Sequence, residues 1–371
     1  MQKLEIDRGY MAAKLAELLE TPSPSGMTDV VVGKLCRELE ALGIDYELTR
    51  RGAIRADLPG KEKSPDRAIV SHLDTLGAMV KRIKENGRLE IVPIGHWSSR
   101  FAEGARASLY LDDGSHLRGT VLPLKASGHV YADAIDTQKT SWSTVEFRID
   151  EKTDNAAETV ALGVHVGDTL AIDPQPEFLD NGFVCSRHLD DKAGVAAVLA
   201  AAKAVLDDGT DLPIDCHLLF TISEEVGVGA SHVLHGDVAE MVSIDNGTIA
   251  PGQNTSPFGV TISMQDMTGP FDWHLTRRLI GLCKKHGIEH ARDVFKYYRS
   301  DAAAALEAGN DIRTALLCFG LDASHGYERT HLDSLECLAC LLALYMQSPP
   351  IFKGDSEALG TREDLPFERM R

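Results

Sequence analysis

The feature that most constrains this chain is a repeated pattern in which a short apolar run ends abruptly in acidic or histidine side chains. His72, the pair Glu224 and Glu225, and Asp245 each follow directly on such a run. Short apolar runs bounded by polar residues are typical of buried strands in a mostly parallel sheet. Because parallel strands present their carboxyl ends at one edge, we expect these side chains to converge there.

Helix-like and strand-like patterns alternate around these runs. Helices are expected at residues 10–20, 27–42, 191–206, 271–286, 302–308 and 332–346. Strands are expected at residues 67–71, 214–223, 241–244, 259–264 and 314–320. This alternation predicts an α/β fold of three layers, α/β/α, with helices on both faces of a mostly parallel central sheet.

Between residues 76 and 174 the pattern changes to short β-rich pieces separated by turn-forming pairs. These pairs are Asn86-Gly87, Asp113-Gly114, Ser127-Gly128 and Gly167-Asp168. Such turns predict a small all-β domain inserted into the main one. The expected organisation is a main domain in two parts (1–75 and 175–348), the insert (76–174) and a polar C-terminal extension (349–371).

Charge and composition exclude several classes of partner. The 371 residues contain 38 Lys and Arg against 56 Asp and Glu, a net charge of −18, which argues against nucleic acid or an anionic membrane. The chain has no signal-like start and no apolar segment of about 18 residues, so we expect a cytoplasmic protein. Seven scattered cysteines indicate reduced thiols, and Cys337 with Cys340, although spaced like zinc ligands, lies in an apolar run typical of core.

Several of the polar residues have chemistry that suits a metal site. His72 and Asp74 share a face of an extended segment, so one can bind a metal while the other acts beside it. Of the paired Asp190 and Asp191, which precede an Ala-rich helix, one carboxylate could cap the helix while the other bridges two cations. Each motif alone has a simpler reading, as a local hydrogen bond or a helix cap.

Two further motifs complete the set. Glu224 and Glu225 are adjacent and leave their strand on opposite faces, which suits one as a ligand and the other as a general base, although a solvated loop pair is the simpler alternative. Asp245 and His331 add one carboxylate and one imidazole. Oxygen ligands with two imidazoles favour two divalent cations, zinc first and cobalt or manganese as alternatives.

Together these residues resemble peptidase family M42, whose members are cytoplasmic dimetal aminopeptidases. The resemblance extends to about Met346 and rests on seven segments: Ser71-His-Leu-Asp-Thr-Leu-Gly77, Val92-Pro-Ile-Gly-His-Trp97, Leu162-Gly-Val-His-Val-Gly-Asp168, Leu189-Asp-Asp-Lys192, Ser223-Glu-Glu-Val-Gly227, Ser300-Asp301 and Tyr327 to His331. Three further segments are similar to a bacterial branch associated with the osmoprotectant N-acetylglutaminylglutamine amide: Thr49-Arg-Arg-Gly-Ala-Ile54, Phe101-Ala-Glu-Gly-Ala105 and Ser186 to Lys192.

The resemblance implies a role for each site residue. Asp190 would bridge the two metals, Glu225 and His331 would complete one ligand set, and His72 and Asp245 would complete the other. Glu224 would be the general base, and Asp74 would orient His72. The sequence departs from the family in offering two histidines before the last helix; His331 is preferred because it directly precedes that helix, and His325 is the alternative. Lys192 also stands where the family frequently has arginine.

The implied function is removal of the N-terminal residue from short peptides or small amides. The resemblance also implies that the β-rich insert helps to assemble a homo-oligomer, a hollow tetrahedron of twelve subunits. Two alternatives stay open at this point. One is a dimetal deacylase or carboxypeptidase acting on N-acylated amino acids or blocked dipeptides; the other is a non-catalytic oligomeric scaffold that kept the fold without the chemistry.

Overall fold

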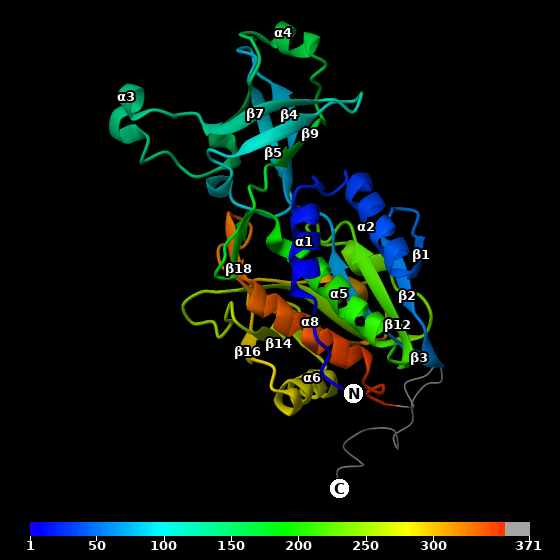
Figure 1. Ribbon diagram of the computed structural model, residues 1–371. Coiled ribbons are helices and arrows are strands. Elements are labelled where there is room, and N and C mark those ends of the chain that lie inside the picture. The colour runs from blue at the N-terminus through cyan, green and yellow to red at the C-terminus, as the bar shows by residue number, and fades with distance from the viewer. Residues whose placement is uncertain (353–371) are drawn as a thin grey trace.

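A nine-stranded sheet forms the centre of the molecule in the computed structural model, which describes residues 1–352 (Figure 1). Its strands are ordered β1-β2-β12-β3-β13-β17-β14-β15, and β16 pairs with β14. They span Asp45–Leu48 (β1), Ile54–Leu58 (β2), Gly60–His72 (β3), Leu212–Thr221 (β12), Val238–Thr248 (β13), Val260–Asp266 (β14), Gly269–Pro270 (β15), His290–Val294 (β16) and Arg313–Leu321 (β17).

The sheet is parallel at its centre and antiparallel toward both edges. Strands β12, β3, β13 and β17 run parallel to one another, whereas β2 joins β12 and β14 joins β17 in antiparallel fashion. The central strands are the apolar runs identified in the sequence, and their side chains are buried on both faces. Burial of this kind contributes about 1.5–3 kcal/mol for each large aliphatic side chain.

Helices pack against this sheet. The long ones span Arg8–Leu19 (α1), Asp29–Leu42 (α2), Leu189–Asp208 (α5), Trp273–His286 (α6), Asp301–Glu307 (α7) and Leu332–Met346 (α8). Helix α5 is rich in alanine, whose small side chain lets α1 and α8 approach it closely while it lies on β3 and β13. Figure 1 shows α1, α5 and α8 side by side over one face of the sheet.

The β-rich insert forms a separate closed barrel above the sheet in Figure 1, in the order β4-β5-β8-β7-β6-β9. Its strands span Gly77–Ile83 (β4), Leu89–Ile94 (β5), Arg106–Tyr110 (β6), His116–Pro123 (β7), Val145–Ile149 (β8) and Thr169–Ile172 (β9), with two short helices at Gly128–Tyr131 (α3) and Ala156–Ala161 (α4). Phe147 fills the barrel core, and Gly119 is needed beside it because a Cβ there would lie 2.4 Å from the Phe147 ring.

A small third sheet lies beside the start of α5. It consists of Glu177–Phe178 (β10), Phe183–Ser186 (β11) and Glu328–His331 (β18). The mixed α/β architecture with a separate small barrel confirms the predicted fold class. The division of the chain at residues 76, 174 and 348 stays a prediction, and the extension from residue 353 lies outside the described residues.

Within residues 1–352, no helix is both long enough and apolar enough to cross a membrane.

Candidate metal centre

Six acidic and histidine side chains meet at the carboxyl edge of the central strands. They are His72 at the end of β3, Asp190 in the first turn of α5, Glu224 and Glu225 after β12, Asp245 in β13 and His325 in the loop before β18. Two overlapping groups have ligand atoms within 4.8 Å of one another: His72 with Glu224 and Asp245, and His72 with Asp190 and Glu225. The structure thus brings together five of the preferred residues that the sequence indicated, and with them His325, the alternative to His331.

Asp190 lies between the two imidazoles. Its Oδ1 is 3.2 Å from His72 Nε2, and its Oδ2 is 3.4 Å from His325 Nε2. The Asn246 amide donates a hydrogen bond to Oδ2 at 2.8 Å and holds the carboxylate in place. A carboxylate whose two oxygens face different ligand groups has the geometry required to bridge two cations.

The two histidines are held in the orientation typical of metal ligands. His72 Nδ1 lies 3.0 Å from the carbonyl oxygen of Asp74, and His325 Nδ1 lies 2.8 Å from that of His96 in the insert. A carbonyl oxygen only accepts, so Nδ1 carries the proton in both rings. Each Nε2 therefore faces the carboxylates, where it holds a proton in the absence of metal and could bind a cation in place of that proton.

The structure does not bring His331 to this cluster. Its Nδ1 accepts a hydrogen bond from the Asp333 backbone N–H at 3.0 Å and caps α8, while Nε2 lies 2.8 Å from the Asn181 carbonyl oxygen. Both ring nitrogens are therefore occupied by the backbone. The intervening residues form strand β18, and extended chain of about 3.3 Å per residue carries His331 away from His325. The sequence preferred His331 as a ligand, but in this geometry its ring faces the backbone, whereas the ring of His325, the alternative, faces the cluster.

Asp74 contacts the site through both its backbone and its side chain, and its predicted role of orienting His72 stays a prediction. Its carboxylate lies 3.6 Å from His72 Nδ1, which bonds to the Asp74 backbone carbonyl instead. The carboxylate accepts hydrogen bonds from the backbone N–H groups of Glu224 at 3.1 Å and Glu225 at 3.3 Å. Asp74 thus fixes the turn that carries both glutamates. Asp191 fixes the end of β3, because it accepts hydrogen bonds from the Ser71 hydroxyl and the His72 backbone N–H.

The cluster holds more buried negative charge than its own residues can balance. Burial raises the pKa of Glu224 and of Asp245, and it raises the pKa of Glu225 to about 8. Although burial lowers the pKa of a histidine, the Asp190 carboxylate more than offsets this effect and raises the pKa of His325 to about 10. Acid groups forced together in a dry site favour either protons or cations. The donor set therefore fits divalent metal ions.

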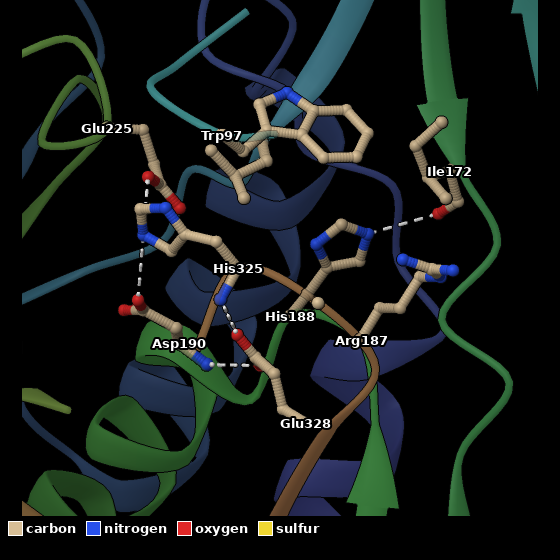
Figure 2. Close-up of a pocket in the computed structure, with 10 residues that line it drawn as sticks. Trp97, Ile172, Arg187, His188, Asp190, Glu225, His325 and Glu328 are labelled. Atoms are coloured by element: carbon tan, nitrogen blue, oxygen red, sulfur yellow. Dashed lines mark hydrogen bonds and ion pairs between the residues drawn. The ribbon is translucent and has the colours of Figure 1, made fainter. Parts of the chain in front are cut away.

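A pocket lies beside the cluster (Figure 2). It is lined by Leu76, Trp97, Ile172, Arg187, His188, Asp190, Glu225, His325, Gly326 and Glu328. Burial and the Lys192 ammonium lower the pKa of His188 to about 3, so this imidazole is neutral and its Nε2 bonds to the Ile172 carbonyl oxygen at 3.1 Å. The pocket therefore combines residues of the β-rich insert with residues of the central α/β part.

Three polar residues at this site were not identified from the sequence. Asn246 holds Asp190, and the buried Glu328 accepts hydrogen bonds from the backbone N–H groups of Asp190 and His325 at 3.2 and 2.9 Å. Arg187 lines the pocket. Asn246 could have been found by its adjacency to Asp245, and Arg187 and Glu328 by their place in segments that carry the family resemblance, although those segments have no periodic pattern that singles the two residues out.

Comparison with known proteins gives concordant matches. The sequence model described as M42 glutamyl aminopeptidase matches residues 52–341. YhfE of Bacillus subtilis, provisionally named an aminopeptidase, is 38% identical over 337 residues, covering 91% of this chain and 97% of that protein. A glutamyl aminopeptidase of Lactococcus lactis is 26% identical over 227 residues, covering 59% of this chain and 61% of that protein.

Two solved structures share the fold. An aminopeptidase from Desulfurococcus kamchatkensis superposes with a TM-score of 0.82 at 20% identity, covering 93% of this chain and 96% of its own. The TET1 peptidase of Pyrococcus horikoshii, described as assembling into a tetrahedron or a large octahedral shell, has a TM-score of 0.80 at 23% identity, covering 91% and 100%.

Proposed function

Because the chain belongs to the M42 glutamyl aminopeptidase family, we propose that it removes the N-terminal residue of short peptides with two divalent cations bound at the carboxyl edge of its central sheet. Membership of this family makes it a hydrolase of the metallo-aminopeptidase class. The observation that carries the proposal is the buried cluster in which two Nδ1-protonated imidazoles direct Nε2 at a shared Asp190 carboxylate.

The proposed ligand sets follow from the observed neighbours. Asp190 belongs to both sets, Glu225 and His325 complete one, and His72 and Asp245 complete the other. Mixed imidazole and carboxylate ligands favour zinc, with cobalt and manganese as alternatives. When bound, the two cations would supply the Lewis acidity that lowers the pKa of water and stabilises the oxyanion of the tetrahedral intermediate.

Glu224 is the proposed general base. Its carboxylate lies 3.9 Å from His72 Nε2, and burial raises its pKa above that of an ordinary glutamate. A raised pKa brings a carboxylate closer to the working pH, where proton transfer is most effective. Glu224 would take a proton from the attacking water and return it to the leaving amine.

Hydrolysis of matched substrates tests this function. Zinc-loaded enzyme is offered aminoacyl and dipeptide amides, each with a free amine and as its N-acetyl counterpart, and the Glu224→Gln variant is assayed beside it. We expect Glu224-dependent cleavage of the free-amine substrates. Cleavage confined to acetylated substrates would assign the site to a deacylase, and no cleavage of either set would leave a scaffold.

Arg187 is the proposed contact for a substrate carboxylate. It lies across the pocket from Glu225 and His325 in Figure 2, and within residues 1–352 its partly buried guanidinium forms no hydrogen bond or ion pair. A desolvated guanidinium favours a carboxylate, which it can bind with two hydrogen bonds. With Ala-Ala as substrate, we expect Arg187→Met to raise KM more than with Ala-Ala amide. An equal change for both would exclude the C-terminal carboxylate as the group recognised.

A homo-oligomeric, cytoplasmic enzyme completes the proposal. Six large apolar side chains of the insert are exposed and available for subunit contacts: Phe101, Leu124, Val130, Tyr131, Val160 and Val166. The TET1 peptidase, of which one structure is described as a dodecamer, has the same fold, and this supports a closed shell of twelve subunits. All seven cysteines are unpaired thiols, as suits the reducing cytoplasm. Light scattering after size exclusion should give about twelve times the 40.3 kDa chain mass, and a monomer would contradict this part of the proposal.

A further inference from the structure

A second group of histidine and carboxylate side chains lies toward the opposite end of the same central strands. Asp57 of β2 and His217 of β12 are direct cross-strand partners, and His235 comes from the loop that precedes β13. One ligand atom of each lies within 4.8 Å of the other two. None of the three belongs to the catalytic cluster. We refer to Asp57, His217 and His235 as the distal cluster.

The distal cluster directs two imidazoles at one carboxylate oxygen. Asp57 Oδ1 is 2.6 Å from His217 Nδ1 and 3.0 Å from His235 Nε2, and the two ring centroids are 4.1 Å apart. The His217 side chain is buried, whereas that of Asp57 is 47% exposed. The cluster therefore has three oxygen and nitrogen donors and one side open to water.

A neutral His217 cannot donate a hydrogen bond to both of the carboxylates that its ring nitrogens face. Its Nε2 lies 3.3 Å from Asp66 Oδ2, an oxygen that also accepts a hydrogen bond from the Asp237 backbone N–H at 2.8 Å. A neutral imidazole carries one N–H, so donation to Asp66 leaves a lone pair on Nδ1 facing Asp57 Oδ1. Two acceptors at 2.6 Å require a second proton between them, and a divalent cation could replace that proton once the Asp57 carboxylate moves outward. A buried carboxylate behind the ring, as Asp66 is here, is also the arrangement that orients zinc-binding histidines.

The loop that supplies His235 is fixed from both sides. The Arg55 guanidinium donates hydrogen bonds to the carbonyl oxygens of Val233 and Leu234 at 2.7 and 3.2 Å. On the other side, a Cβ at Gly236 would lie 2.4 Å from Asp66 Oδ2, so the loop approaches the sheet as closely as the backbone allows. The position of His235 is therefore set by the fold before any ligand binds, which lowers the entropic cost of forming a metal site.

We propose that the distal cluster binds a divalent transition-metal ion, with zinc preferred, separately from the catalytic cations. Two imidazoles and one carboxylate are a common zinc ligand set, and water would fill the open fourth position. The half-exposed Asp57 side chain has room to rotate outward and admit the ion. The metal would tie the loop at residues 233–237 to β2 and β12, and would thus stabilise the fold without taking part in hydrolysis.

Counting bound zinc tests the distal site without relying on peptidase activity. The full chain is stripped with a chelator, dialysed against buffered zinc and analysed for zinc per subunit. Two single variants, His235→Gln and Asp57→Asn, each remove one ligand, and His232→Gln changes an exposed histidine close by in the chain. We expect wild type and His232→Gln to bind one zinc more per subunit than either ligand variant, and the melting temperature of wild type to rise more on zinc addition.

Equal zinc content in all four proteins would overturn the proposal and would leave a protonated His217 as the cation between the carboxylates. Having two variants guards against a folding defect in one, and circular dichroism of each identifies such a defect. Turnover at saturating zinc should be the same in all four. If no protein hydrolyses peptides, the catalytic assignment fails while the distal zinc count still decides this question.

Discussion

The two ends of the central strands treat buried charge in opposite ways. Near the start of the buried part of β3, Arg67 is completely buried and forms an ion pair with Glu240 of β13 at 2.9 Å, and its guanidinium also donates to the carbonyl oxygen of Tyr345. At the carboxyl end, four buried carboxylates face two imidazoles. The buried charges of Arg67 and Glu240 therefore balance each other. The fold leaves a surplus of acid where the proposed function requires cations.

The largest expected effect is a loss of turnover that depends on which of two glutamates, Glu224 or Glu240, is changed. Glu224→Gln should lower turnover by about 10²- to 10⁴-fold, the usual contribution of a general base, with zinc content unchanged. Glu240→Gln should leave turnover near that of wild type and lower stability instead, because it leaves Arg67 buried beside a neutral amide. Steady-state kinetics and thermal melts of both variants check this, and equal kinetic losses would erase the distinction between the two ends.

The second-largest expected effect is a loss of stability when the ion pair between Arg67 and Glu240 is broken. Arg67→Met leaves the Glu240 carboxylate buried without a counter-charge, so we expect a loss of about 3–5 kcal/mol in the free energy of unfolding. Replacing both partners, as Arg67→Met with Glu240→Leu, should recover most of that loss. Denaturant unfolding measures both. If the double variant were as unstable as the single one, charge balance would not be what Arg67 provides.

At the carboxyl end of the central strands, removing a proposed metal ligand should lower the amount of bound metal. His325→Ala should weaken binding of one cation by more than the roughly 10- to 100-fold that follows from changing an outer partner of a metal site. His331→Ala should keep both cations and lose about 1 kcal/mol of stability, because only the cap of α8 is removed. Zinc titration of the two variants decides whether His325 or His331 is a metal ligand. Metal loss in His331→Ala alone would restore the ligand assignment made from the sequence.

The smallest expected effect concerns pH. In metal-free enzyme the pKa values of Glu225 and His325 are raised to about 8 and about 10, above the unfolded values of about 4.5 and 6.5. A pKa raised in the folded state contributes stability that is lost as pH rises through it. The melting temperature of stripped enzyme should therefore fall between pH 6 and 9, by roughly 2–4 °C for each kcal/mol lost. The melting temperature of zinc-loaded enzyme should change less over this pH range. If the melting temperatures of stripped and zinc-loaded enzyme fell in parallel, the proposal that cations bind at these residues would be contradicted.

The apolar runs let the sequence predict the centre of the fold well. The expected strand at residues 314–320 corresponds to β17, and the last helix begins and ends at the expected residues, 332 and 346. Strands β2 and β18 were not predicted, because Ile54–Leu58 and Glu328–His331 are short and partly polar and gain their pairing from distant strands.

The site was predictable to the same extent as the strands that carry it. His72, Glu224, Glu225 and Asp245 follow buried runs, so their meeting point is determined by parallel topology. His325 lies in a turn with a left-handed backbone, φ 65°, and is oriented by the carbonyl oxygen of His96 in another domain. Proximity in sequence to the last helix favoured His331 instead. Contacts between segments more than 200 residues apart leave no local pattern from which to choose.

The most direct test of the two-cation centre is anomalous X-ray diffraction at the zinc absorption edge from crystals of zinc-loaded enzyme. We expect two strong peaks at the carboxyl edge of the central sheet, with the Asp190 carboxylate between them and His72 and His325 each bound to a different one. The absence of paired peaks there, or a peak bound to His331, would contradict the proposed centre.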